Sequence, residues 1–389
     1  MMISNVIEFA ARTLTPNIDT GTLRGLLNLF VETKAIPVLR DMTARAIMTL
    51  VAAVNLKELL QDRVVFEGAL DGVIQVLQYL RFRPEYCNDA YMISLATQRV
   101  ACYMYHVEPS NEKKTSMHTT SSIAKFNKMF ESVLLLLIDL CSTGKDRSSI
   151  TPEDQSPTPL SVSVDTLSRI SKSEKYRQQL VQIGVLKVLV PLLLQRSIKG
   201  VQEDEKGVQE DEKEDYVFVK SRDESVRLSA VTTLSYLVEQ PAARSNVVSS
   251  SSSSPQESYM DVYTCGWISA KIVDHDALPP LIELVSDASS QNLDVVRIAA
   301  KVLANLASFR PNRDAMLRAG AVMGIVRGLA SVHSDETLIL EYLMKTLSQI
   351  VESSQTNEPY VCFLLDHYFF FQITTLSHKN RHNSYPLKY

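Results

Sequence analysis

Apolar residues recur at helical spacing along the chain, and one short pattern occurs four times. A Gly or Asp is followed by two apolar residues and, after two further positions, by another apolar pair. The pattern starts at Gly68, Gly184, Asp276 and Gly320. Gly and Asp suit a tight corner between two helices, where the backbone turns left-handed, and the apolar spacing that follows predicts a helix. Each start is therefore a predicted helix-to-helix corner.

A second pattern follows the corners and predicts a further helix in each unit. In it, a leucine precedes another apolar residue by three positions. The pairs are Leu50 with Ala53, Leu167 with Ile170, Leu234 with Leu237, Leu303 with Leu306, and Leu347 with Ile350. Leu303 and Leu347 lie 44 positions apart, whereas the spacings from Leu167 to Leu234 and on to Leu303 are 67 and 69. Repeats of ~40–47 residues are typical of helical solenoids, so we predict an all-α solenoid of three-helix units with insertions.

Four polar stretches interrupt the pattern, and we predict that they are disordered loops. They span residues 107–122, 143–159, 197–221 and 241–258. The third contains an acidic segment, Gly200 to Lys206, that is repeated as Gly207 to Lys213, and the fourth contains Ser249 to Ser254. Such compositions cannot bury enough apolar surface to fold. The acidic loop is interpreted as a solvated segment, with folding over a neighbouring basic surface as the alternative.

The remaining segments divide one solenoid over residues 1–389 into regions of different regularity. We predict divergent repeats at 1–106 and 123–142, a middle repeat at 157–196 and 222–240, well-formed repeats at 265–352, and a C-terminal cap at 357–377. Six Phe and Tyr residues gather between Tyr360 and Phe371. They could anchor a partner or a membrane surface, but helical spacing favours packing over the end of the core.

Composition narrows the class of protein. Only 12 of 389 residues are glycine, which is low for sheet folds rich in turns, and the net charge of -4 gives no excess of basic residues for nucleic-acid backbones. The five cysteines are odd in number and form no C-x-x-C pair, which favours reduced thiols over a disulfide framework. The longest aliphatic run, Val133 to Ile138, is far shorter than the ~20 residues that a membrane-spanning helix needs. We therefore expect a protein of the cytoplasm, with the nucleus as a second compartment, that binds no nucleic acid and has no transmembrane segment.

No motif of an enzyme is present. The seven histidines show no metal-ligand spacing, and no G-x-S-x-G or G-x-G-x-x-G occurs. Gly144 and Lys145 are followed by Asp146, and Asp139 stands where a phosphate loop needs its first glycine. We expect no catalytic activity, no metal and no cofactor.

Two stretches resemble the armadillo repeats of the catenin and importin-α families. Arg318-Ala319-Gly320-Ala321-Val322 is similar to the family's corner into its second helix. Ala299-x-x-x-Leu303-x-Asn305-Leu306 is similar to its third helix, and the likeness is tightest over Asp274 to Val351. The related HEAT class stays an alternative for the first 150 residues. The resemblance implies a right-handed solenoid whose third helices line a concave groove that binds extended peptides.

In that family a ladder of asparagines holds the peptide backbone, because an amide both donates and accepts hydrogen bonds. The resemblance puts Arg169, Tyr236, Asn305 and Gln349 at the ladder positions here, and Asp165, Thr232, Lys301 and Lys345 one turn earlier. Importin-α proteins carry tryptophans at the earlier positions. The lysines would repel a lysine-rich cargo, which argues against a nuclear-import adaptor.

We therefore predict an interaction scaffold or adaptor whose groove binds an extended partner segment, acidic or phosphorylated. The predicted groove residues are Tyr236, Arg297, Lys301, Asn305, Lys345 and Gln349, and Arg227 is a further cation on a predicted third helix. The alternative is a regulator of a folded partner, such as a small GTPase or a kinase, that acts through loops or solenoid ends. The sequence does not determine the oligomeric state.

Overall fold

The computed structural model describes residues 20–53, 63–82, 90–106, 119–143, 158–193, 224–239, 255–287, 292–333 and 335–353. Within these ranges all regular elements are helices and no β-strand occurs, which confirms the all-α expectation there. The helices are α2 (Thr20–Glu32), the 3-10 helix η2 (Thr33–Ala35), α3 (Pro37–Ala53), α5 (Arg63–Arg81), α6 (Ala90–His106), α7 (Thr119–Thr143), α8 (Pro159–Ser171), α9 (Glu174–Gln182), α10 (Leu186–Leu193), α11 (Glu224–Val238), α12 (Pro255–Asp274), α13 (Leu278–Ser286), α14 (Leu293–Ser308), α15 (Arg310–Arg318), α16 (Ala321–Ser331) and α17 (Thr337–Ser353).

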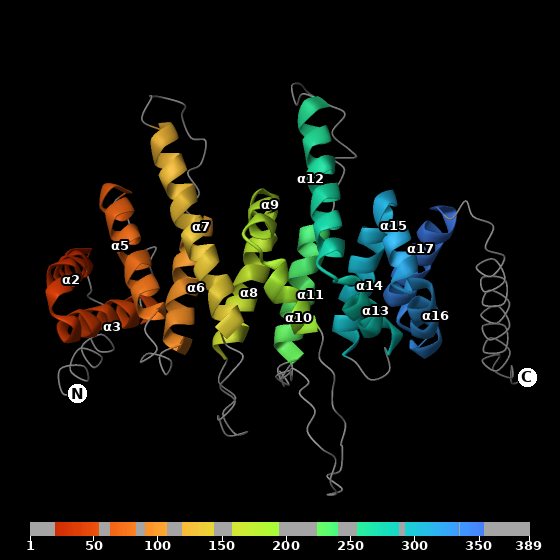
Figure 1. Cartoon of the computed structure of the whole chain (residues 1–389), viewed down its shortest axis with the longest axis horizontal. Coiled ribbons are helices and arrows are strands. Elements are labelled where there is room, and N and C mark those ends of the chain that lie inside the picture. Colours follow the sequence, from red (N-terminus) through yellow and green to blue (C-terminus); the bar gives the residue numbers. More distant parts are fainter. Residues whose placement is uncertain are drawn as a thin grey trace, which may run out of the picture.

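The helices form one elongated row, from α2 at one end to α17 at the other (Figure 1). The row has two parallel series of neighbours. In the first series each helix contacts the next, in the order α3, α6, α8, α11, α14 and α17. In the second the order is α2, α5, α7, α10, α13 and α16. The first series contains the predicted third helices and includes α6, which the leucine pattern did not identify.

Three of the four predicted corners are present. The backbone is left-handed at Gly184, Asp276 and Gly320, with φ of 90°, 56° and 78°. The amide of Val185 donates to the carbonyl of Leu180 at 3.1 Å, which is the hydrogen bond of a glycine-terminated helix. Each corner thus ends the first helix of a unit and starts the second.

The fourth predicted corner, at Gly68, was wrong. Gly68 lies inside α5, which runs without interruption from Arg63 to Arg81, and its φ is not positive. Glycine permits both helical and left-handed backbone, so its presence alone cannot specify a corner. The predicted corner is therefore absent from this unit.

Two predicted loops overlap helices at their C-terminal ends. α7 begins at Thr119, within the predicted loop 107–122, and α12 begins at Pro255, within 241–258. Proline suits the first turn of a helix because the amides of that turn have no partner within the helix. The Ser/Thr run at the start of α7 likewise suits a helix terminus. The cap at 357–377, the acidic duplication and the serine run lie outside the described residues.

The leucines that defined the third helices lie in one continuous hydrophobic core. Leu167, Leu234 and Leu303 have no exposed surface, and Leu50 and Leu347 are 2% exposed. Their partners three positions later are also buried, except Ala53, which is exposed at the end of α3. The helical faces assigned from the sequence are therefore correct for the leucines.

Buried arginines join each of two first helices to the end of the preceding third helix. Arg177 on α9 donates from Nε to the carbonyl of Ser171 at 3.1 Å, and Arg313 on α15 donates to that of Ala307 at 2.7 Å. Both arginines reach six residues back. They satisfy carbonyls that a helix terminus leaves without a partner in the helix.

Candidate partner-binding surface

The six predicted groove residues, which we call the polar row, lie on three neighbouring helices. Tyr236 is on α11, Arg297, Lys301 and Asn305 are on α14, and Lys345 and Gln349 are on α17. Their spacing of four residues along α14 and α17 puts them on one face of each helix. All six are half-buried or exposed on helices that otherwise contribute mainly to the core.

Two contacts connect the polar row across neighbouring helices. Lys172, just after α8, places its Nζ 5.6 Å from the centroid of the Tyr236 ring. Glu239, just after α11, accepts a hydrogen bond from Nζ of Lys301 on α14 at 2.8 Å. Since Tyr236 and Glu239 are three residues apart, these contacts lie close together at the end of α11.

The same face continues toward α6. Arg169 and Asp165 form an ion pair at 2.9 Å on α8, as their spacing of four residues allows. Burial raises the pKa of Cys102 on α6, while the nearby charges of Arg169 and Arg99 oppose that shift and Asp165 adds to it. The two positions predicted on α8 therefore lie beside α6.

Most cations on this face are paired within the protein. Arg297 pairs with Asp294, Lys301 with Glu239, and Arg169 with Asp165. Lys345 differs, because it is exposed and no acidic residue of the described ranges forms an ion pair with it. The net attraction for an anionic ligand is therefore smaller than the count of basic residues suggests.

Two amides of the polar row have hydrogen-bonding capacity left over. The Oε1 atom of Gln349 is buried and accepts no hydrogen bond from the described residues. Asn305 is half-buried, and it is its backbone carbonyl, not its amide, that accepts a 2.6 Å bond from Ser308. A half-buried amide such as that of Asn305 can donate to and accept from a peptide backbone, whereas the Oε1 atom of Gln349 is shielded from solvent in this conformation.

Arg227 does not belong to the polar row. Burial lowers its pKa, and the charges of Glu224 and Glu283 oppose that shift. Glu283 lies on α13, in the second series of helices. Arg227 and Tyr236 are nine positions apart, or two and a half helical turns, so they point to opposite sides of α11. The sequence prediction identified the helix of Arg227 correctly but did not specify its face.

Sequence reasoning missed Glu239 and Lys172. Both lie at the end of a third helix, outside the positions that the asparagine ladder defines. The only available signal was the placement of an acid three residues after Tyr236, and surface acids at helix ends are too common for that to be informative.

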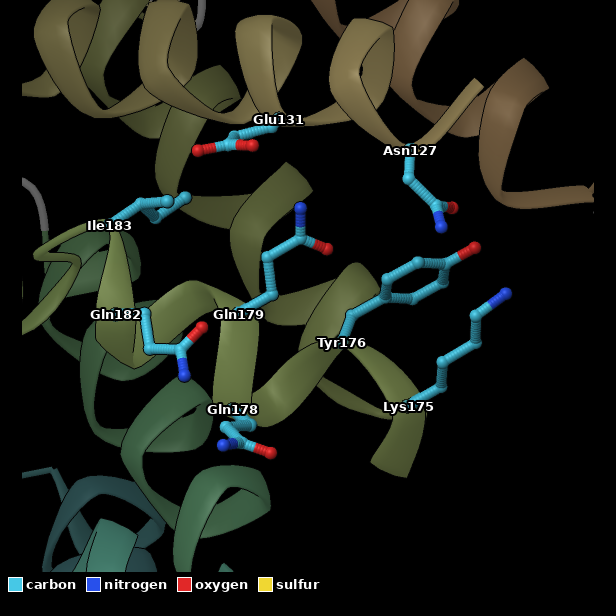
Figure 2. Close-up of a pocket in the computed structure, with 8 residues that line it drawn as sticks. All are labelled: Asn127, Glu131, Lys175, Tyr176, Gln178, Gln179, Gln182 and Ile183. Carbon is cyan, nitrogen blue, oxygen red and sulfur yellow. The ribbon is translucent and has the colours of Figure 1, made fainter. Parts of the chain in front are cut away.

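A second surface feature lies between α7 and α9. It is a recess of about 450 Å³ lined by four amide side chains, with Glu131 and Lys175 as its charged groups (Figure 2). The Tyr176 ring, which also lines the recess, packs against Phe130, with centroids 4.6 Å apart, and against Tyr105 at 6.0 Å. In Figure 1, α7 and α12 extend beyond the row on the same side. The recess thus has a largely polar lining with one acidic and one basic side chain.

The described residues contain no arrangement typical of a metal centre. No three His, Cys, Asp or Glu side chains among them lie close enough to hold a metal ion. Burial raises the pKa of Cys141 to about 12, which exceeds the opposing effect of its hydrogen bond with Ser163. The Cys141 thiol is therefore protonated at neutral pH and is a poor nucleophile. None of the helices described here has the length and apolar character needed to cross a membrane.

These observations define the class: a helical-repeat protein with a polar face along consecutive third helices. Residues 269–308 match the family model of the Armadillo/beta-catenin-like repeat. The match includes the end of α12, all of α13 and α14, and three residues of the polar row. The resemblance to armadillo repeats is thus confirmed for this unit. No curated protein matches the chain.

Proposed function

We propose that this protein is a non-catalytic scaffold or adaptor that binds an extended, acidic or phosphorylated segment of a partner protein along the polar row. Armadillo repeats generally mediate protein–protein interaction, and the matched unit contains Arg297, Lys301 and Asn305. The observation that carries the proposal is the equivalent position of Lys301 and Lys345, with Asn305 and Gln349 one turn further on, on two helices in contact. Ammonium groups and amides at this spacing suit carboxylates and a peptide backbone respectively.

The proposal includes a particular geometry for the row. We infer a right-handed solenoid of armadillo-like three-helix repeats in which α11, α14 and α17 line the concave side. The repeated left-handed corners at Gly184, Asp276 and Gly320 support this, because each unit then turns its chain in the same way. We place the protein in the cytoplasm, with the nucleus as a second compartment.

The test measures binding of a fluorescein-labelled peptide of ten glutamates by fluorescence anisotropy. The double variant Lys301→Glu, Lys345→Glu should weaken binding at least about tenfold, since two attractive contacts become repulsive. The control is Lys125→Glu, Lys128→Glu, which makes the same charge change at exposed positions of α7. Equal binding by the wild type and the first variant, with helicity intact, would contradict the proposal, as would an equal loss in the control.

A second candidate function is regulation of a folded partner, such as a small GTPase or a kinase. The recess between α7 and α9, beside the projecting parts of α7 and α12, favours this alternative because it offers a shaped polar surface away from the polar row (Figures 1 and 2). Gln178→Arg together with Gln182→Arg should then abolish regulation and leave the ten-glutamate peptide bound. The predicted loops 197–221 and 241–258 are the other candidate contact sites for a folded partner. Deleting residues 197–221 and 241–254 should then also abolish regulation and leave the ten-glutamate peptide bound.

A further inference from the structure

Glu239 is held at the end of α11 by a buried arginine. Its backbone carbonyl accepts a hydrogen bond from Arg177 at 2.7 Å. The same guanidinium donates to the carbonyls of Ser171 at 3.1 Å and Lys172 at 3.3 Å, and the Arg177 side chain is only 6% exposed. Since Arg177 is fixed by three backbone contacts, the position from which the Glu239 side chain extends is fixed as well.

The Glu239 carboxylate lies between two cations. Its Oε1 atom is 2.8 Å from Nζ of Lys301, and its Oε2 atom is 3.8 Å from a terminal nitrogen of Arg177. The Lys301 and Glu239 side chains are 31% and 38% exposed, so solvent and solutes reach both. A pair this exposed contributes little to stability, because water screens it and its two side chains lose conformational freedom.

The next unit has no such carboxylate. Leu234 and Leu303 are corresponding residues 69 positions apart, so the position of α14 that corresponds to Glu239 is Ser308. A serine carries no charge, and Lys345 on α17 has no ion-pair partner among the described residues. Of two equivalent lysines in the polar row, one is occupied by the protein's own carboxylate and the other is open.

We propose that Glu239 is a built-in competitor for the acidic partner segment: its carboxylate occupies Lys301 in the free protein, and a carboxylate or phosphate of the partner displaces it. This rests on the proposed function of the polar row. When the partner displaces Glu239 from Lys301, the Glu239 carboxylate still has a cationic partner, because it can turn to the guanidinium of Arg177, which it already approaches. Glu239 thereby lowers affinity for weakly acidic segments and favours those that supply a closely matching anion at Lys301.

The test uses the full chain and the fluorescein-labelled peptide of ten glutamates. Glu239→Gln removes the competing charge and retains the size of the side chain, so binding should become about twofold to fivefold tighter. Glu239→Asp keeps the charge but shortens its reach to Lys301, and its affinity should fall between those of the wild type and Glu239→Gln. Glu32→Gln, the same change at an exposed residue of α2, is the control and should bind like the wild type.

A double-variant cycle separates displacement from a general change in charge. In a Lys301→Gln background, Glu239→Gln should no longer tighten binding, because there is no lysine left to release. The proposal is overturned if Glu239→Gln binds like the wild type or more weakly, or if its gain persists without Lys301. Lys345→Glu tests the proposed function separately: if it leaves peptide binding intact, the polar row is not the site, whereas lost binding in Lys345→Glu with no gain in Glu239→Gln rejects only the role of Glu239.

Discussion

The two faces of α14 have different environments, and the spacing of apolar residues in the sequence predicted this difference. Leu303 has no exposed surface, whereas Lys301 and Asn305 on either side are half-buried. The periodicity of apolar residues identified this difference because it follows directly from 3.6 residues per helical turn. The partners of Lys301 were not predictable, since Glu239 is 62 positions away.

Leu303→Asp should destabilise the protein by about 3–5 kcal/mol, because it buries an unpaired carboxylate and removes apolar contact between α11, α14 and α17. Urea unfolding followed by circular dichroism measures the change. Leu338→Asp is the control, since Leu338 is 51% exposed in the first turn of α17 and should change stability by less than about 0.5 kcal/mol. A loss below about 1 kcal/mol for Leu303→Asp would mean that the side chain is not in the core.

At the scale of elements, the second helices α13 and α16 approach each other through glycines. A Cβ atom added at Gly324 would overlap the side chain of Ile282, and one added at Gly328 would overlap the backbone carbonyl of Val285. The sequence did not single out these two glycines, because glycine inside a helix gives no local signal of a close approach. The three corners that are present were predictable, because a left-handed backbone favours Gly or Asp at the corner itself and so leaves a local signal in the sequence.

Gly328→Ala should cost about 1–3 kcal/mol, because α13 has to shift to make room for the methyl group. Gly25→Ala is the matched control on α2, where no atom lies within 4 Å of the added Cβ. It should be neutral or stabilising by up to about 1 kcal/mol, since alanine favours helix. Thermal unfolding compares the two variants, and equal stabilities would contradict the close packing of α13 and α16.

Across the described part of the molecule, each helix of the row contacts chiefly its neighbours, so the hydrophobic core, although continuous, consists of interfaces between adjacent helices. Contacts run from α3 to α6 and onward to α17, and the described helices at opposite ends of the row are far apart in Figure 1. In such arrays stability is approximately a sum of units and of the interfaces between them. A local change should therefore weaken one part of the molecule.

Hydrogen exchange can test this locality. Leu303→Asp should speed amide exchange in α11, α13, α14 and α17 and leave α3 and α6 protected as in the wild type, because their interfaces are unchanged. Mass spectrometry of peptic fragments resolves these helices. Uniform loss of protection along the chain would show instead that the row unfolds as one cooperative unit.

The sequence by itself determined the features that depend on local spacing. These are the helical faces that contain Leu167, Leu234 and Leu303, and the corners at Gly184, Asp276 and Gly320. Periodicity and backbone preference act within a few residues, so they can be read without knowing the fold.

Only the tertiary structure decided where distant segments meet. In the structure α5 is continuous through Gly68, and Arg227 lies near Glu283 on α13. Glu239 contacts Lys301, which is 62 positions away in the sequence. Glycine and charged side chains accept several environments at similar free energy, so packing between units selects one of them.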